Sequence, residues 1–443
     1  MYKTFHDYII KMFLFLLISF KFPHKFTGSG ISRIELRRVL PLLFVLLAST
    51  YNIFAQASKT LPLSSQDSLV IKKADSIVRQ KDLADIFYRT FKINAKKGPD
   101  SALEKAGKLF FSFAPALGYT LEGGPIAVAT VNASFYTQTP DSTNLSVFTF
   151  GGEYSLHNQV LVPIISNIWT KDNKYDWLGD WRYYSYHAET YGLGTDNFLS
   201  REDATYYSYV RIYQEVLRHF SSNYYIGLGY NFDGHYNISN NSDITDYQQY
   251  NEGLTKTISS GPIIHLMYDS RTNINNPKDA LYASLIYRTN FTSLGSDQNW
   301  RYVLVEVRKY ISLSPHDVLA FWTWNEFTWG TAPYFDLPAN QWDTYSNTGR
   351  GFIQGFYRGT NLVYLEAEYR FGITRNGLLG GVIFSNAGSA TQWPSNKFEY
   401  VAPGNGVGMR IKFNKYSDVN LCIDYAVGIN GSHGFFFNLG EVF

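Results

Sequence analysis

The chain has 443 residues, of which 17% are charged and 17% aromatic, and its formal net charge is +2. Soluble domains usually carry about a quarter charged residues, so the composition argues against an ordinary soluble protein. The 35 Tyr and 33 Phe are typical of a protein that meets two water–lipid interfaces, where amphipathic rings are favoured. Basic and acidic residues are nearly balanced, which leaves no large basic field and excludes nucleic acid as a partner.

Residues 1–57 have the features of an export leader. Three arginines within residues 33–38 precede an apolar run over residues 39–48, and an Ala-Gln-Ala cleavage signature ends at Ala57. We predict a signal peptide that is cleaved after Ala57. An uncleaved membrane anchor is the alternative, but the apolar run is shorter than the ~20 residues of a spanning helix, and no later run approaches that length.

The next stretch, residues 58–107, is polar and has a helical pattern. Apolar residues recur at spacings of three to four between Ser68 and Phe91, and a Lys-Lys-Gly-Pro sequence ends the pattern at Pro99. We expect a short helical segment on the periplasmic side of the membrane. A plain helical linker is the alternative.

From Leu109 onward, short strand patterns alternate with turn residues to the last residue, Phe443. About sixteen strands are predicted, an even number as in bacterial single-chain barrels. They lie near residues 109–121, 126–137, 144–156, 159–172, 177–187, 204–218, 223–238, 254–269, 281–291, 299–313, 317–329, 358–373, 376–388, 400–414, 418–429 and 434–443. The predicted fold is therefore all-β, a transmembrane antiparallel barrel over residues 108–443.

The strand from Leu362 to Phe371 gives the clearest alternation. One face reads Tyr364, Glu366, Glu368 and Arg370, whereas the residues between them are apolar. Similar alternation places Arg410, Lys412 and Asp424 opposite apolar residues on two later strands. A strand with a lipid face and a charged face is typical of a membrane barrel with a polar lumen.

Loop lengths agree with this arrangement. If the N-terminal side is periplasmic, the long segment from Gly330 to Phe356 comes after the eleventh strand on the outside, and the short turn from Asp269 to Pro277 lies on the periplasmic side. The last strand is expected to carry three consecutive phenylalanines, residues 435–437, and to end at Phe443 in the periplasm.

Four motifs, in this order, resemble those of the bacterial surface-antigen family, the superfamily of BamA-like and TamA-like outer-membrane barrels. A turn looks like the family's Asp-x-Arg-x-Asn…Pro turn, an Arg-Gly-Phe sequence stands in the long loop, an acidic strand comes after it, and the next strand resembles the family's Phe-x-Asp-x-Gly. The residues are Asp269, Arg271, Asn273 and Pro277; Arg350, Gly351 and Phe352; Glu366 and Glu368; and Phe384 to Gly388, with Asn386 at its centre. The resemblance covers residues 109–443.

The resemblance implies that the long loop folds back into the lumen, where Arg350 pairs with acidic residues of the wall. A guanidinium suits this task because its planar fork of donors matches carboxylates. Glu366 and Glu368 are the implied partners, with Glu368 the better match to the motif. Asn386 occupies the position of the family's second wall acid, where it cannot form an ion pair.

The implied function is to assist the insertion or translocation of proteins or lipids at the outer membrane of a Gram-negative bacterium. Implied partners are outer-membrane lipid, lipopolysaccharide, and client proteins or assembly machinery, around a monomeric barrel. Assembly factors of the family carry polypeptide-transport-associated domains, and about fifty residues between leader and barrel are too few for one. A porin-like channel or transporter without an assembly role is therefore the alternative.

The sequence predicts no enzyme. After the leader it contains no Gly-x-Ser-x-Gly, His-Glu-x-x-His, Cys-x-x-Cys or phosphate-binding glycine loop, and its histidines lack metal-ligand spacing. We therefore expect no catalytic residue, no metal and no cofactor. A barrel lipase that assembles Ser, His and Asn from neighbouring strands is a remaining alternative, because a linear motif scan cannot detect it.

Overall fold

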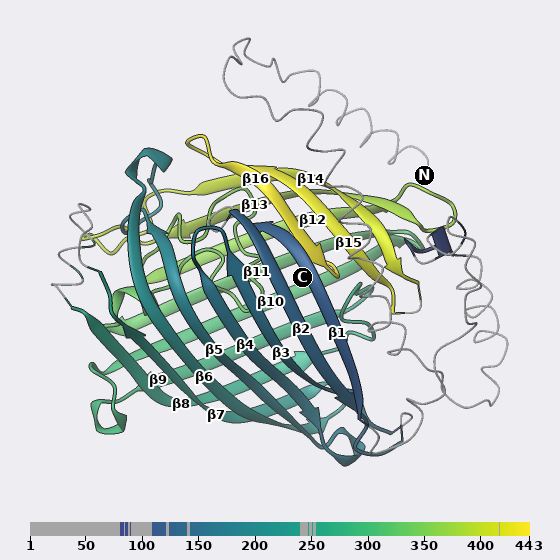
Figure 1. Ribbon diagram of the computed structural model, residues 1–443, viewed down its shortest axis with the longest axis horizontal. Coiled ribbons are helices and arrows are strands. Elements are labelled where there is room, and N and C mark those ends of the chain that lie inside the picture. The colour runs from purple at the N-terminus through teal and green to yellow at the C-terminus, as the bar shows by residue number, and fades with distance from the viewer. Residues whose placement is uncertain are drawn as a thin grey trace, which may run out of the picture. The chain divides into compact units, whose positions relative to one another are not determined.

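The computed structural model describes residues 80–83, 85–86, 89, 109–120, 124–139, 142–239, 247, 250, 254–415 and 417–443. The described strands form one antiparallel sixteen-stranded sheet that curls into a barrel, with each strand beside its neighbours in chain order (Figure 1). The strands are β1 (Phe110–Thr120), β2 (Gly124–Phe135), β3 (Ser146–Ser155), β4 (Val160–Trp169), β5 (Tyr175–Thr190), β6 (Asp203–Ser221), β7 (Tyr224–Tyr236), β8 (Lys256–Asp269), β9 (Leu281–Asn290), β10 (Trp300–Ser314), β11 (Asp317–Gly330), β12 (Asn361–Gly372), β13 (Leu379–Ala390), β14 (Ala402–Asn414), β15 (Val419–Val427) and β16 (His433–Leu439). The predicted fold class is confirmed.

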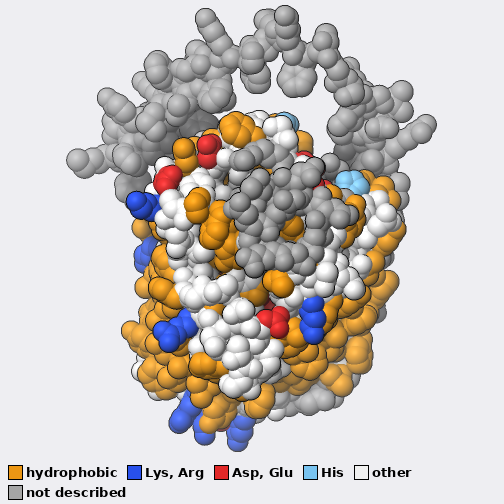
Figure 2. Space-filling view, turned by 90° about the vertical axis from the view of Figure 1, so that its left-hand side faces the viewer, with side chains coloured by type: hydrophobic (Ala, Val, Ile, Leu, Met, Phe, Trp, Pro, Cys, Tyr) orange, Lys and Arg blue, Asp and Glu red, His pale blue; other side chains and the backbone are white. Residues whose placement is uncertain are grey.

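The two faces of the sheet meet different surroundings. On β12, Leu365 is 63% exposed, whereas the next residue, Glu366, is 3% exposed. The same contrast separates exposed Met409 from buried Arg410 on β14. Hydrophobic side chains cover much of the described outer surface seen in Figure 2. An apolar outside and a charged inside are what a lipid-facing barrel with a polar lumen requires.

Strand register places inward-facing residues of β11 to β15 side by side in one row across the wall. Trp322 on β11 lies opposite Glu366 on β12, Glu366 lies opposite Asn386 on β13, and Asn386 lies opposite Gly404 on β14. On the next pair, Gly408 of β14 lies opposite Asp424 of β15. Residues far apart in sequence therefore line one patch of the lumen wall.

The barrel has a seam between its first and last strands. β1 and β16 lie beside each other, yet within the described residues no hydrogen-bonded ladder joins them (Figure 1). β16 has seven residues and is the shortest of the described strands, whereas β1 has eleven. Because a barrel hides its strand edges by pairing them, this seam is the weakest line of the wall.

One predicted strand end is wrong. β16 ends at Leu439, so Phe443 is not on the last strand. Gly440 has φ +94° and turns the chain out of the sheet into the lumen, where Phe443 is 2% exposed. The left-handed backbone at Gly440 is open to glycine and strained for other residues, which gives the strand a definite end.

The predicted leader, residues 1–57, lies outside the described residues, as does most of the predicted helical segment of residues 58–107. In its described part, the backbone N–H of Lys81 donates to the carbonyl of Asn376 at 2.9 Å, and Lys415 pairs with Asp85 at 2.8 Å. This part therefore contacts the turns after β12 and β14. No helix in the described part of the chain is long and apolar enough to cross a membrane.

We predict that Leu365→Arg destabilises the barrel by about 2–4 kcal/mol, because it places a cation on the lipid face in the middle of β12. Tyr345→Arg is the matched control, since Tyr345 is similarly exposed, at 68%, but lies on a loop beside the polar interior. Denaturant unfolding in lipid vesicles, followed by Trp fluorescence, measures both. Equal losses for the two variants would contradict the assignment of the lipid face.

Candidate functional site

The connection between β11 and β12, residues 331–360, folds into the barrel and is called the lumen loop here. Its aromatic side chains are its core: Tyr334, Phe335, Phe352, Phe356 and Tyr357 are each at most 6% exposed. Phe352 packs against Phe356 and Tyr357, with ring centroids 5.3 and 5.6 Å away. The loop is therefore a packed body inside the barrel and does not extend away from it.

Polar side chains fix the path of the lumen loop. Asn340 donates from Nδ2 to the carbonyl of Ile353 at 2.8 Å and accepts from the N–H of Tyr357 at 3.0 Å, so it joins the two arms of the loop. The backbone N–H of Gly194 donates to the carbonyl of Arg358 at 2.6 Å, which ties the loop to the connection between β5 and β6. These bonds satisfy backbone groups that would otherwise be buried without partners.

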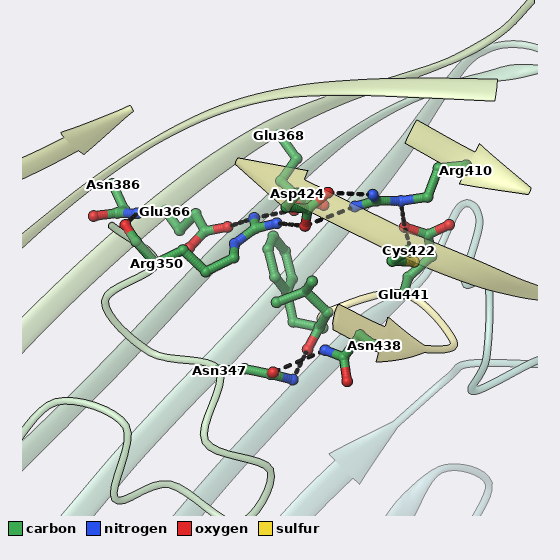
Figure 3. A network of polar contacts seen from close by, with 12 residues as sticks. Asn347, Arg350, Glu366, Glu368, Asn386, Arg410, Cys422, Asp424, Asn438 and Glu441 are labelled. Atoms are coloured by element: carbon green, nitrogen blue, oxygen red, sulfur yellow. Dashed lines mark hydrogen bonds and ion pairs between the residues drawn. The ribbon is translucent and has the colours of Figure 1, made fainter. Parts of the chain in front are cut away.

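Arg350 is the centre of the site (Figure 3). Its guanidinium is buried, and it forms ion pairs with Glu366 and Glu368 of β12 and with Asp424 of β15, the last at 2.5 Å. Burial raises the strength of each ion pair because little water screens it, and it also makes the charge costly unless carboxylates surround it. A single arginine therefore ties the loop to two separate parts of the wall.

β13, one of the two strands between β12 and β15, holds Arg350 from another side. The guanidinium carbon lies 3.5 Å from the ring centroid of Phe384, which is a cation–π contact. Asn386 makes no ion pair; its Nδ2 donates to the backbone carbonyl of Arg350 at 2.9 Å. The structure thus brings Arg350, Glu366, Glu368 and Asn386 together. Asn386 binds the backbone of Arg350, whereas an acidic residue at this position would pair with the guanidinium.

The ion-pair network continues beyond Arg350. Arg370 donates from Nε to Glu368 at 2.7 Å, and Arg410 bridges Asp424 at 2.5 Å and Glu441 at 2.8 Å (Figure 3). Each carboxylate is shared by two cations or capped by a further donor. Shared partners fix the geometry of every member, so the loop arginine is held by the network as a whole.

Glycines on the wall make room for the loop. A Cβ added at Gly404 would stand 2.8 Å from the carbonyl oxygen of Arg350, and one at Gly428 would stand 2.5 Å from the ring of Phe352. Both positions tolerate a loop only because no side chain is present. The wall and the lumen loop therefore fit each other closely.

A second network lies on the opposite wall. Asp233 of β7 pairs with Arg288 of β9 at 2.5 Å and accepts from the hydroxyl of Tyr209 at 2.5 Å, while Arg211 lies 3.9 Å away. The loop enters this network through Asp336, which accepts from the hydroxyl of Ser259 at 2.5 Å. The lumen loop is therefore tied to both sides of the barrel.

The predicted turn motif lies apart from Arg350. Arg271 forms a bidentate pair with Asp269, with Nε–Oδ1 and Nη2–Oδ2 distances of 2.9 and 2.8 Å. Asn273 accepts from two backbone N–H groups of its own turn and donates to the carbonyl of Ser417 at 3.2 Å, and Pro277 is buried. These residues fasten the β8–β9 turn to the β14–β15 turn.

A histidine, a serine and a glutamate do meet on the lumen wall. His265 lies 2.9 Å from a carboxylate oxygen of Glu215 and 2.9 Å from the hydroxyl of Ser284. However, Ser284 is 4% exposed, and its direct cross-strand neighbour is Glu306. The three residues therefore form a hydrogen-bond chain on the wall, with the serine shielded from solvent.

Sequence reasoning missed Asp424 as a partner of Arg350 and missed the Asp233 network. Alternation had placed Asp424 inward, but only strand register shows that β15 approaches the loop arginine. The same period-two pattern on β6 and β7 would have placed Arg211 and Asp233 on the inward face. Within the described ranges, no group of three His, Cys, Asp or Glu residues could hold a metal ion.

Comparison with known proteins finds a likeness in fold only. No protein-family model matches the sequence, and no curated protein matches it. Among solved structures, BamA from Haemophilus ducreyi lacking POTRA domains 1–3 matches with a TM-score of 0.52 and 14% identity, over 75% of this chain and 69% of that one. CdiB from Acinetobacter baumannii gives a TM-score of 0.48 and 12% identity, over 75% of this chain and 60% of that one.

The BamA match shows that this chain has the fold of a BamA-type β-barrel. The barrel class is thus defined by the succession of sixteen antiparallel strands among the described residues and by the polar lumen. At this level of identity the likeness concerns architecture, and the chemistry of the lumen has to be argued from its own residues.

We predict that Arg350→Ala destabilises the folded barrel by about 3–5 kcal/mol, because three buried carboxylates lose their shared cation. Arg350→Lys should be intermediate, since an ammonium cannot present a planar fork to all three. Arg301→Ala, at an exposed arginine of β10, is the control. Equilibrium unfolding in vesicles measures the losses, and an Arg350→Ala value equal to the control would refute the role of the network.

The carboxyl group of Asp336 makes the stability of the barrel depend on pH. Burial, reinforced by the charge of Asp233, raises the pKa of Asp336 from its ordinary value of 3.8 to about 7. The folded state then holds this proton more tightly than the unfolded state, so the contribution of Asp336 to stability falls as pH rises from about 4 to about 7. His235, 3.7 Å away, faces the same carboxyl group.

Asp336→Asn should flatten this pH dependence and raise the melting temperature at pH 8 relative to the parent. Asp172→Asn, at an exposed turn residue, should leave the slope unchanged. Melting temperatures in vesicles at pH 5 and pH 8 test the prediction. An unchanged slope in Asp336→Asn would show that this carboxyl group does not titrate in that range.

Proposed function

We propose that the chain is an outer-membrane barrel of the surface-antigen, BamA-like type, which assists the insertion or translocation of proteins or lipids at the outer membrane of a Gram-negative bacterium. In this proposal residues 1–57 are removed on export, residues 58–107 form a short periplasmic segment and residues 108–443 form the barrel. Its partners are outer-membrane lipid, lipopolysaccharide and client proteins, and it is neither an enzyme nor a cofactor-binding protein.

The observation that carries the proposal is the Arg350 ion-pair network. A packed loop in the lumen would obstruct a simple channel, but it suits a barrel that must stay closed until it acts. We call the ion pairs of Arg350 with Glu366, Glu368 and Asp424 the latch, because they hold the lumen loop in place. Arg350 is buried between β12 and β15, and those strands belong to the half of the wall next to the seam. In this proposal, a change in these ion pairs alters the position of β15 and therefore the seam where β16 meets β1.

The seam supports the same function. An unpaired strand edge can pair with an incoming strand, because its N–H and C=O groups are free to form a new ladder. The described residues place such an edge between β1 and β16. In the proposed mechanism the latch holds the lumen closed while the seam offers an edge to a client strand or a path to lipid.

The porin-like alternative has an observation of its own. A cavity of about 280 Å³ lies between the lumen loop, the wall of β2 to β6 and β16, and its lining includes the charged side chains of Glu153, Arg182, Arg211 and Asp343. The loop thus leaves part of the lumen unfilled. A continuous water path through this cavity would make the barrel a channel for small hydrophilic solutes.

Single-channel conductance of refolded residues 58–443 in a planar bilayer separates the two functions. We expect a mostly closed barrel with rare, brief openings, and more frequent openings in Arg350→Ala. A steady ohmic pore in the parent would instead support the porin-like alternative. In vesicles, the closed barrel should also speed the folding of a second, purified barrel protein, and a rate equal to that in empty vesicles would refute the insertion role.

A further inference from the structure

After β16 the chain turns into the lumen. We call residues Gly440–Phe443 the inward segment. Gly440 donates from its N–H to the carbonyl of Asn420 at 2.8 Å, and the N–H of Glu441 donates to the carbonyl of Asn275 at 2.8 Å. The first bond ties the start of the segment to β15, and the second ties it to the β8–β9 turn. The inward segment therefore has a fixed path.

The side chain of Phe443 fills an aromatic site on the wall. Its ring is stacked on Trp322 with a centroid distance of 5.2 Å and lies 6.3 Å from Tyr310. The guanidinium of Arg370 lies 5.1 Å from the centre of the same ring and donates from Nη2 to the backbone oxygen of Phe443 at 3.0 Å. A site formed by aromatic rings and a guanidinium favours the binding of an aromatic side chain.

Glu441, two residues earlier, fills a second and polar site. Its carboxylate accepts from Nε of Arg410 at 2.8 Å (Figure 3). It also accepts from Nδ2 of Asn420 at 2.7 Å, and Nε of Arg370 lies 3.6 Å away. The wall thus binds an acidic residue and an aromatic residue that are separated by one position. Arg370 contributes to both sites.

The inward segment also holds the lumen loop. The carbonyl of Val442 accepts from Nδ2 of Asn347 at 2.8 Å, and the side-chain oxygen of Asn347 accepts from Asn438 of β16 at 2.8 Å (Figure 3). Asn347 stands three residues before Arg350. Arg410, which binds Glu441, also binds the Asp424 that pairs with Arg350. The segment and the latch therefore share partners.

The position of the inward segment affects the seam as well. Residues 440–443 would lengthen β16 along β1 if they were extended, but inside the lumen they leave β16 with seven residues. When the inward segment fills the two sites on the wall, β16 is short and the lumen loop is held in place. An empty one would mean a freed loop and four more residues available to pair at the seam.

We propose that Trp322, Tyr310, Arg370 and Arg410 form a lumenal binding site for a peptide segment of the pattern acidic-x-aromatic. The inward segment of the same chain occupies it, and emptying it releases the lumen loop and changes the β1–β16 seam together. The proposal rests on the latch function proposed above and adds the element that controls it.

Two conservative variants test the site with little risk to folding. Phe443→Leu keeps most of the apolar volume but removes the stacked ring, and Glu441→Gln keeps the shape but removes the charge. Phe321→Leu is the control, because Phe321 lies on β11, away from the seam, and is 41% exposed on the outer face. Heat-dependent gel mobility verifies that each barrel is folded before single-channel recording.

We expect at least tenfold more frequent openings in Phe443→Leu and Glu441→Gln than in the parent or in Phe321→Leu. A synthetic peptide with the sequence of residues 438–443 should suppress the openings of Phe443→Leu, and the same peptide with Ala at its last position should not. Lumen-site variants as quiet as the parent, or a peptide without effect, would overturn the inference.

The Arg350→Ala variant separates this failure from a failure of the proposed function. If Arg350→Ala opens but the two lumen-site variants stay closed, the latch stands and the control by the inward segment is wrong. If Arg350→Ala also stays closed, the latch itself is wrong.

Discussion

The buried guanidinium of Arg350 is the interaction on which the interior of this barrel depends. A cation removed from water needs carboxylates in contact with it, and Glu366, Glu368 and Asp424 meet that need only if β12 and β15 stand in their observed register. The cation–π contact with Phe384 and the hydrogen bond from Asn386 to the backbone of Arg350 hold the same residue from β13. The electrostatic requirement therefore fixes geometry over a large part of the lumen.

The same physics divides the barrel into two unlike halves. Aromatic side chains pack the lumen loop against the wall of β10 to β13, whereas a cavity with charged residues in its lining lies between the loop, β16 and the wall of β2 to β6. Arg350 and Asp424 stand at the border between the two regions, because both are buried and both also line the cavity. The closure of the lumen is thus an asymmetric property of the barrel.

Much of this architecture could be predicted from the sequence. Period-two alternation located sixteen strands and placed Glu366 and Glu368 inside, because lipid and lumen impose opposite polarity on alternate residues. Asp424 escaped detection as a partner of Arg350, since a contact between positions 74 residues apart depends on strand register. Phe443 was misplaced because an aromatic-rich ending favours a strand, and one left-handed glycine overrode that preference.

The glycines beside the loop have a consequence for recognising such proteins. In an open, water-filled barrel, a side chain at Gly404 would meet only the side chain of Asn386 on the neighbouring strand. Here Gly388, Gly404 and Gly428 lie against the lumen loop, and a Cβ at each position would come too close to it. Inward-facing glycines clustered on neighbouring strands are thus an imprint of an internal plug. Such an imprint can be sought in sequences whose loops are too divergent to compare.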